Sequence, residues 1–152
     1  MKMTCCAIAF IMVGCSLYKS NVKCSKLTND FFHITSIDER MRQFPNHTIN
    51  EQYELYIFGN QVVHPPAIYL APLFAEQGPI IIPLLRSKLE AAPEELTIRD
   101  IVSVLRWMAK LKLYDFSKDL ELISLLDKRV RDMNGIWKPI TYKMFSEIHS
   151  MQ

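Results

Sequence analysis

The 152-residue sequence predicts an all-α fold, in the form of a compact multi-helix domain. Apolar residues recur three and four positions apart in several segments, which gathers them on one face of a helix. Two capping boxes, Ser36-x-x-Glu39 and Thr48-x-x-Glu51, have the spacing that opens a helix. The most β-like run, residues 80–82, is flanked by prolines, which disfavour a strand. These patterns predict roughly seven helices.

The two capping boxes locate the first helices. Residues 36–43 are predicted to form a short helix that Pro45 stops. Residues 48–60 are predicted to form a longer helix, with Gly59-Asn60 as its end signal. The apolar face of this second helix carries Tyr53, Tyr56 and Ile57.

Prolines mark the boundaries of the next two helices. Proline fits a first helical turn, so the break His64-Pro65-Pro66 predicts a helix over about 66–77. Gly78 is its expected C-terminal cap. Residues 79–92 are predicted to form the following helix, with an irregular start because Pro83 lies in its first turns.

The strongest apolar stripe follows Thr97, which is predicted to cap its helix. The stripe consists of Ile98, Ile101, Val102, Leu105, Met108 and Ala109. Ser117 is predicted to cap the next helix, which should end at Asn134-Gly135. Its apolar face is expected to contain Leu120, Ile123, Leu126 and Val130. Pro139 begins the last predicted helix. The apolar residues of that helix are Ile140, Met144, Phe145 and Ile148.

Residues 1–14 have the organisation of a signal peptide. Lys2 supplies a positive start, and the apolar run that follows is too short to cross a membrane as a helix. The sequence Met12-Val13-Gly14-Cys15 resembles the lipobox of bacterial lipoproteins, in which apolar and small residues precede an invariant cysteine. The resemblance implies cleavage after Gly14 and lipid attachment to Cys15. A buried N-terminal helix and an uncleaved signal anchor are the alternatives.

The same resemblance implies a place in the bacterial cell envelope, held to a membrane by the lipid on Cys15. Ser16 follows the lipid site in place of aspartate, which favours the outer membrane and a periplasm-facing domain. Residues 15–28 are polar and lack periodicity, so we expect a flexible tether there and a single helical domain over 29–152. Cys24 falls in this tether and is the only thiol left beside Cys15 after cleavage.

A second resemblance covers residues 66–131. The stretch 76–85, EQGPIIIPLL, resembles the turn and second helix of a HEAT-type repeat, where a turn glycine precedes an apolar-Pro-Leu-Leu run. It implies two HEAT-like helix pairs with flanking helices. The second pair lacks both the glycine and the proline, so an ordinary helical bundle is an equal alternative.

The sequence offers little for catalysis, metal binding or nucleic-acid binding. The formal charge of +2 gives no electrostatic footprint for nucleic acid. No G-x-S-x-G elbow, helical histidine pair or glycine-rich phosphate loop occurs in it. We therefore expect no catalytic residue, no metal ligand and no cofactor.

Aromatic residues suggest protein binding instead. Trp137 beside Lys138, or the turn at His64-Pro65-Pro66, is the predicted binding patch, although core packing and a rigid turn would also explain these residues. The predicted function is a membrane-tethered protein-interaction module with a protein partner. The alternatives are an envelope hydrolase or accessory acting on peptidoglycan or glycan, and a carrier with an enclosed apolar cavity.

Overall fold

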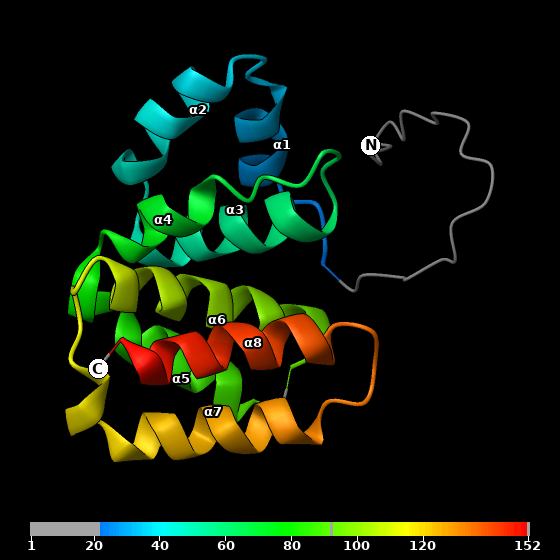
Figure 1. The fold of residues 1–152 in the computed structure, drawn as a ribbon. Helices are drawn as coiled ribbons and strands as arrows, with labels where there is room; N and C mark the ends of the chain where they lie inside the picture. The colour runs from blue at the N-terminus through cyan, green and yellow to red at the C-terminus, as the bar shows by residue number, and fades with distance from the viewer. Residues whose placement is uncertain (1–21, 92, 152) are drawn as a thin grey trace.

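Eight α-helices and three short 3-10 helices make up the part of the chain that the computed structural model describes, residues 22–91 and 93–151 (Figure 1). No strand occurs in these ranges, which confirms the predicted all-α class. In chain order the helices are α1 (Lys26–His33), α2 (Ile37–Gln43), η1 (Phe44–Asn46), α3 (Ile49–Gln61), α4 (Leu70–Ala75), η2 (Gly78–Ile81), α5 (Ile82–Glu90), α6 (Glu95–Lys110), η3 (Phe116–Lys118), α7 (Leu120–Asp132) and α8 (Lys138–Ser150).

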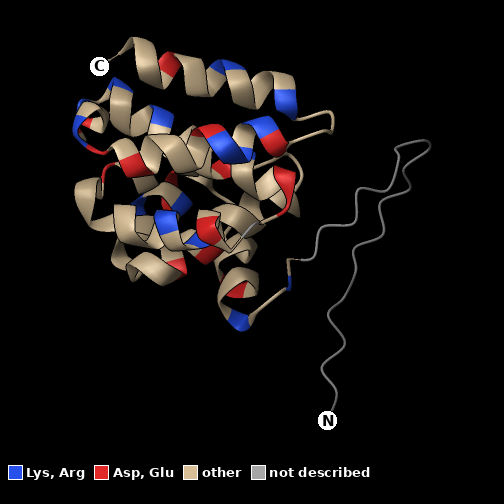
Figure 2. Cartoon of the chain, turned by 90° about the horizontal axis from the view of Figure 1, so that it is seen from below, with Lys and Arg blue, Asp and Glu red and all other residues tan. Residues whose placement is uncertain are grey.

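Helix α6 is the centre of the packing. It lies against α8 and α4, and it also contacts α3, α5 and α7. Helix α7 packs on α8 and α5, while α1 packs on α3 at the other end of the molecule (Figure 1). Charged residues of both signs are interspersed along the helices in the view of Figure 2, as the near-neutral net charge leads one to expect.

The predicted stripe on α6 is the core of this arrangement. All six of its residues are buried, and Ile101, Val102, Leu105 and Met108 are fully inaccessible. The helix begins at Glu95, before Thr97, so the prediction that Thr97 caps it is wrong. The carbonyl of Glu94 already accepts from the backbone N–H groups of Thr97 and Ile98, at 2.9 and 3.1 Å.

Helix α3 begins as its capping box predicts. The Thr48 side chain accepts from the Glu51 N–H at 3.3 Å, and the Glu51 carboxylate accepts from the Thr48 N–H at 2.8 Å. The helix continues through Gly59 to Gln61, so the glycine does not act as an end signal. A Cβ on Gly59 would lie 2.7 Å from Phe32 Cζ and 2.9 Å from Ala67 Cβ. The glycine therefore permits close packing of neighbouring segments.

Gly59→Ala should test this close packing. Alanine normally stabilises a helix interior relative to glycine by about 1 kcal/mol. Overpacking at Phe32 and Ala67 should reverse the sign and lower the free energy of unfolding by about 1–3 kcal/mol. Urea unfolding of the full chain measures the change. Asn50→Ala, at an exposed position of the same helix, is the control, and a stabilised Gly59→Ala protein would contradict the packing argument.

The region after α3 departs from the predicted helix over 66–77. Helix α4 starts only at Leu70, because residues before it form a turn in which the Ala67 N–H donates to the Gly59 carbonyl at 2.9 Å. Gly78 has φ +67, a conformation that glycine adopts without steric cost. Helix α4 ends earlier, at Ala75 with Glu76 as its C-cap, and Gly78 opens η2, so the prediction of Gly78 as the C-terminal cap is wrong. The expected irregular start of the next helix is confirmed, since η2 precedes α5.

Helix α7 is capped by Asp119, so the prediction of Ser117 as its cap is wrong. Asp119 Oδ1 accepts from the Leu122 N–H at 3.1 Å, and the carboxylate also receives Arg86 Nη2 at 2.7 Å. Ser117 lies one turn earlier, in η3. Leu120 is 73% exposed, so its predicted place on the apolar face is wrong. Leu122 is buried with Leu126 and Val130, which lie four and eight residues further along the same face.

The last helix begins one residue before Pro139, at Lys138, close to the predicted start. Three of its four predicted apolar residues, Met144, Phe145 and Ile148, are buried, whereas Ile140 is 46% exposed. The neighbouring Thr141 is fully buried in its place, with its hydroxyl donating to the Trp137 carbonyl at 2.7 Å.

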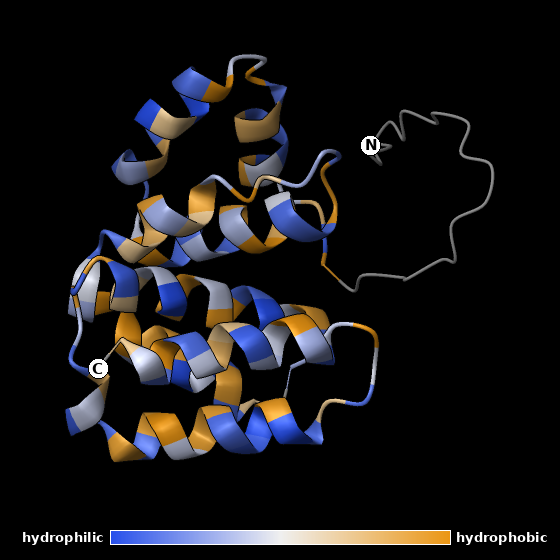
Figure 3. Cartoon of the chain, in the orientation of Figure 1, coloured by the Kyte–Doolittle hydropathy of each residue, from blue (hydrophilic) through white to orange (hydrophobic). Residues whose placement is uncertain are grey.

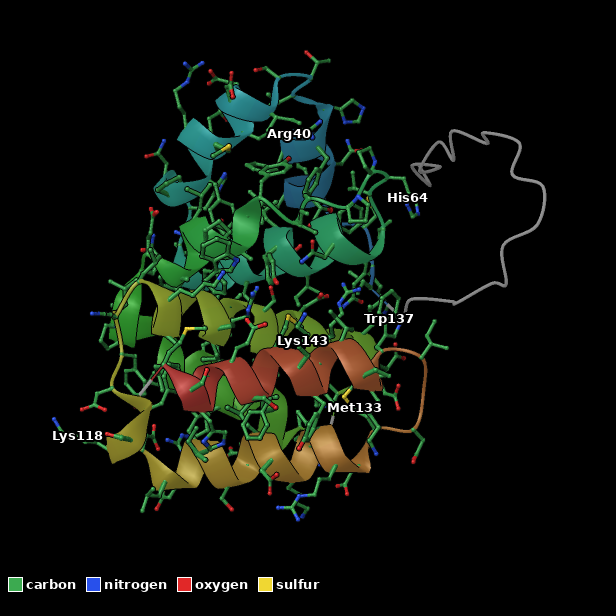
Figure 4. The ribbon with its side chains drawn as sticks, in the orientation of Figure 1. Arg40, His64, Lys118, Met133, Trp137 and Lys143 are labelled. Carbon is green, nitrogen blue, oxygen red and sulfur yellow. The ribbon has the colours of Figure 1, made fainter. Side chains whose placement is uncertain are left out.

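The N-terminal helix begins inside the predicted tether. A capping box formed by Ser25 and Thr28 opens α1 at Lys26, and Thr28 is fully buried, so the tether boundary at residue 28 is wrong. Residues 15–21 lie outside the described residues. Arg40 fastens α2 to this helix (Figure 4): its Nε donates to the Ile34 carbonyl at 2.6 Å and its Nη2 to the Phe32 carbonyl at 3.1 Å.

Candidate functional site

The two binding candidates from the sequence lie on the same side of the molecule in Figure 4. His64 is exposed in the turn that follows α3, and Trp137 is half-buried at the start of α8. Lys138 points elsewhere, because its Nζ donates to the Arg131 carbonyl at 2.8 Å. The predicted lipidation site Cys15 and cleavage site Gly14 lie outside the described residues.

A pocket of about 260 Å³ joins the two candidate regions. Its walls come from α3, the turn before α4, α6 and the start of α8. They include Asn60, Pro66, Ile68, Arg99, Asp100 and Trp137. We call this site the Trp137 pocket. The turn therefore contributes Pro66 and Ile68, while His64 is not part of the lining.

The loop between α7 and α8 is held so that Trp137 faces α6. The Glu95 carboxylate, at the start of α6, accepts from the backbone N–H groups of Asn134 and Gly135, with 2.8 Å from Gly135 N to Oε1. The Arg99 guanidinium then lies over the Trp137 ring, 4.5 Å from its centroid. Such a cation–π contact contributes about 0.5–2 kcal/mol, more when water is excluded.

Arg99 also pairs with Asp100, which is only 1% exposed. Arg99 Nε donates to Asp100 Oδ1 at 2.9 Å, and Gln61 Nε2 donates to Oδ2 at 2.9 Å. Burial raises the pKa of the Asp100 carboxyl, and the Arg99 charge and the Gln61 hydrogen bond oppose this only in part. The pKa is raised overall because Arg99 and Gln61 together do not replace the hydration that the carboxylate loses on burial.

Asp100→Asn should therefore change how stability depends on pH. The folded chain holds the Asp100 proton to a higher pH than the unfolded chain, so this group's contribution is fully present below the unfolded pKa, near 3.8, and is lost as pH rises through the folded pKa. Each tenfold difference in proton affinity corresponds to about 1.4 kcal/mol. The variant should show a flatter decline in the free energy of unfolding above pH 3.8, measured by urea unfolding at a series of pH values.

Asp115→Asn is the matched control for that series. The Ser117 and Lys118 hydrogen bonds lower the pKa of the exposed Asp115 carboxyl. The contribution of Asp115 to the free energy of unfolding is therefore lost as pH falls, whereas that of Asp100 is lost as pH rises. Parallel curves for the wild type and Asp100→Asn would contradict the raised pKa of Asp100.

Tyr56 closes the inner wall of the pocket. Its hydroxyl donates to the Asp100 backbone carbonyl at 2.8 Å, and its side chain is 1% exposed. Burial raises the pKa of Tyr56 well above its ordinary value, with the nearby Asp100 acting in the same direction. Tyr56 is thus a neutral phenol at any physiological pH and serves to fix α3 against α6.

Two polar atoms in this region have no hydrogen-bond partner within the described part of the chain. They are the Asn60 side-chain oxygen and the Trp137 indole nitrogen, and both are buried. Each belongs to a residue that lines the Trp137 pocket. Buried polar atoms of this kind normally have partners, and an exception in a native structure calls for an explanation.

The outer edge of the pocket is apolar and exposed. Ile68 on the turn is 71% exposed and Ile140 on α8 is 46% exposed. Ile136, next to Trp137, is 80% exposed. Figure 3 shows hydrophobic colour on part of the loop between α7 and α8. Exposed aliphatic residues gathered around a half-buried tryptophan and a pocket are typical of a protein-binding surface.

Other chemistry has little basis in the described residues. Across 22–91 and 93–151, no three His, Cys, Asp or Glu side chains gather in a way that could hold a metal ion. Cys24 is exposed, with its Sγ 3.7 Å from the Ser25 carbonyl oxygen. None of the helices in these ranges is long and apolar enough to span a membrane.

Asn60, Arg99 and Asp100 were not among the residues that the sequence singled out as candidates. A signal for Asp100 does exist, because Leu96, Val104 and Met108 continue its i, i+4 row with apolar residues. A carboxylate inside an apolar row indicates a buried polar group. Asn60 carries no comparable signal, since it was expected at a helix end.

The chain has no match among protein-family models, curated proteins or solved structures. Its function is therefore inferred from the geometry of the Trp137 pocket and from the motifs of its own sequence.

Proposed function

We propose that the chain is a lipid-anchored interaction module of the bacterial envelope that holds a partner protein through the Trp137 pocket. The observation that carries the proposal is the pocket itself. Exposed aliphatic residues from two distant segments, Ile68 and Ile140, flank a pocket that Trp137 and Arg99 line. Binding hot spots concentrate in such pockets, where an anchoring side chain becomes fully desolvated.

The anchoring part of the proposal rests on Met12-Val13-Gly14-Cys15. The described chain begins, at the blue end of the ribbon in Figure 1, on the side of the molecule where Figure 4 labels His64 and Trp137. The described chain starts at Val22, seven residues after Cys15. Seven residues span about 25 Å at most when fully extended. A lipid on Cys15 would hold this side of the domain close to the membrane, and the partner would bind there. Because Ser16 favours sorting to the outer membrane, the domain would face the periplasm from that membrane.

We also retain the HEAT-like pairing of helices as a proposal. Its support is the packing of α4 on α6 and of α5 on α7, which places two consecutive helices against the next two. A stack of two pairs leaves edges that the flanking helices α3 and α8 would cover.

An envelope hydrolase is the second candidate, and Asp100 is the observation that favours it. A carboxyl group with a raised pKa beside a pocket is a candidate general acid. The pocket brings one carboxyl group to the site, however, and Arg99 and Gln61 already engage both of its oxygens. Glycoside hydrolysis commonly requires two carboxyl groups on opposite sides of the scissile bond. The binding proposal therefore ranks first.

The experiment that separates the two candidates measures binding and hydrolysis side by side. Full-length protein is crosslinked in its own envelope and recovered with its partner, while purified protein is incubated with peptidoglycan and envelope glycan. We expect a discrete crosslinked partner and no release of fragments, in both the wild type and Asp100→Asn. Hydrolysis by the wild type that Asp100→Asn abolishes would reverse the ranking.

A further inference from the structure

The loop between α7 and α8, residues 133–137, is tied to the start of α6 by the Glu95 carboxylate. Gly135 N donates to Oε1 at 2.8 Å and to Oε2 at 2.9 Å, and Asn134 N also donates to Oε1. A Cβ on Gly135 would clash with Oε2, so the glycine is what allows this close approach. Hydrogen bonds to a charged acceptor are about twice as strong as those between neutral groups. We call this contact the Glu95 latch.

The middle of the loop has little apolar packing that could hold it in place without the latch. Asn134, Gly135 and Ile136 are exposed, and the Ile136 side chain is 80% exposed. A second pocket, of about 150 Å³, is lined by Glu95 and Met133, among others, and leaves space beside the first residues of the loop. Segments with few buried apolar contacts are the ones that open locally. The latch therefore has a large share in fixing the loop.

The position of Trp137, at the end of the loop, is imposed by its surroundings. Its indole N–H is buried and has no acceptor within the described part of the chain. An unsatisfied buried donor is costly, so other contacts must hold the ring where it is. One of them is Arg99, whose guanidinium lies 4.5 Å from the ring centroid. Glu95 lies four residues before Arg99 and therefore on the same face of α6, where it holds the backbone two residues before the ring.

We propose that Glu95 is a positioning residue for the Trp137 pocket. Through Gly135, its carboxylate keeps Trp137 beneath Arg99 and in the pocket wall. Loss of the latch lets the loop move away from α6, and the indole N–H then reaches water. Helix α8 stays in place, because its buried face packs along α6 independently of the loop. The inference rests on the proposed function, since it names the residue that keeps the binding pocket in shape.

Nuclear magnetic resonance with a soluble relaxation agent tests where Trp137 lies. The full chain carrying Cys15→Ser is labelled with ¹⁵N, and Trp137→Phe identifies the Trp137 indole N–H resonance. In Glu95→Ala, we expect a neutral gadolinium chelate to enhance the relaxation of this resonance several-fold more than in the protein without that substitution. The backbone amide of Leu105, in the core, should remain protected in both proteins.

Gly135→Ala breaks the latch from the opposite side, because its Cβ would occupy the place of the Glu95 carboxylate. It should increase the relaxation of the indole N–H as Glu95→Ala does. Glu121→Ala is the matched control: it also removes an acidic residue from a first helical turn, that of α7, and should leave Trp137 unchanged. An unchanged Trp137 signal in Glu95→Ala or Gly135→Ala would overturn the inference. An equal increase at the Leu105 amide would also overturn it, because it would show a loosening of the whole domain.

A binding measurement separates this inference from the proposed function. Benzoylphenylalanine at Ile68 is used to crosslink the full-length protein to its partner in the envelope. Glu95→Ala should lower the yield of the adduct several-fold, whereas Glu121→Ala should not. An unchanged yield in Glu95→Ala would overturn the inference and leave the proposed function standing. Absence of any adduct from the protein with native Glu95 would instead contradict the proposed function, and the relaxation measurement would still decide the position of Trp137.

Discussion

Replacing Leu105 with alanine is expected to lower the free energy of unfolding by about 2–5 kcal/mol, the cost of removing three buried carbon atoms and leaving a cavity. Leu105 is fully buried on α6, the helix that contacts α3, α4, α5, α7 and α8. A cavity at this position cannot close by movement of a single neighbour. Urea unfolding monitored by far-UV circular dichroism measures the change.

Leu120→Ala is the matched control for this substitution. It makes the same chemical change in a helix, at a side chain that is 73% exposed, and should alter stability by less than about 0.5 kcal/mol. Equal effects of the two substitutions would contradict the placement of the α6 stripe at the centre of the core.

Replacing Cys15 with serine is expected to abolish acylation and leave the precursor uncut. The lipid is added to the thiol, and serine offers no thiol. Each buried methylene of an acyl chain contributes about 0.8 kcal/mol to membrane binding, so losing two or three chains removes the anchor. Mass spectrometry of the membrane fraction should find the wild-type chain beginning at an acylated Cys15.

Cys24→Ser is the control for the thiol. Cys24 is exposed beside the N-terminal end of α1, and its replacement should leave acylation and cleavage unchanged. An intact Met1 in the membrane-bound wild-type protein would contradict the lipoprotein proposal.

The helical class and the central stripe could be predicted from the sequence because both depend on local periodicity. Six apolar residues spaced over α6 can share a face in one way only, and that face is buried. The capping box at Thr48 is equally local, since both of its hydrogen bonds join residues three apart. Periodicity and capping were therefore enough to predict the helical class and the central core face.

The errors arose where tertiary contacts override local signals. Gly59 is a residue type common at helix ends, but α3 continues to Gln61, and the missing Cβ instead leaves room for Phe32 and Ala67. Ser117 is a good cap by type, yet Asp119 has the further attraction of Arg86 from α5. Phe32 is 27 positions from Gly59 and Arg86 is 33 positions from Asp119, and periodicity does not register contacts over such separations.

The candidate site, too, was predictable only where its signals were local in the sequence. The sequence drew attention to the tryptophan at 137 and to the turn at 64–66 as separate possibilities. Their meeting in one pocket depends on α3 and α8 both packing against α6. The sequence placed Asn60 at a helix end. The apolar row around Asp100 indicates a buried carboxyl group but not its partners, so the part that both residues play in the site follows only from the packing.

Site-specific photocrosslinking tests the binding proposal most directly. Benzoylphenylalanine is placed singly at Ile68, Ile140 or Leu120 of the full-length protein, all of which are exposed, and the envelope is irradiated. We expect the same discrete protein adduct from positions 68 and 140, on the two sides of the Trp137 pocket, and no adduct from position 120. An adduct from position 120 alone, or none from 68 and 140, would contradict binding through the pocket.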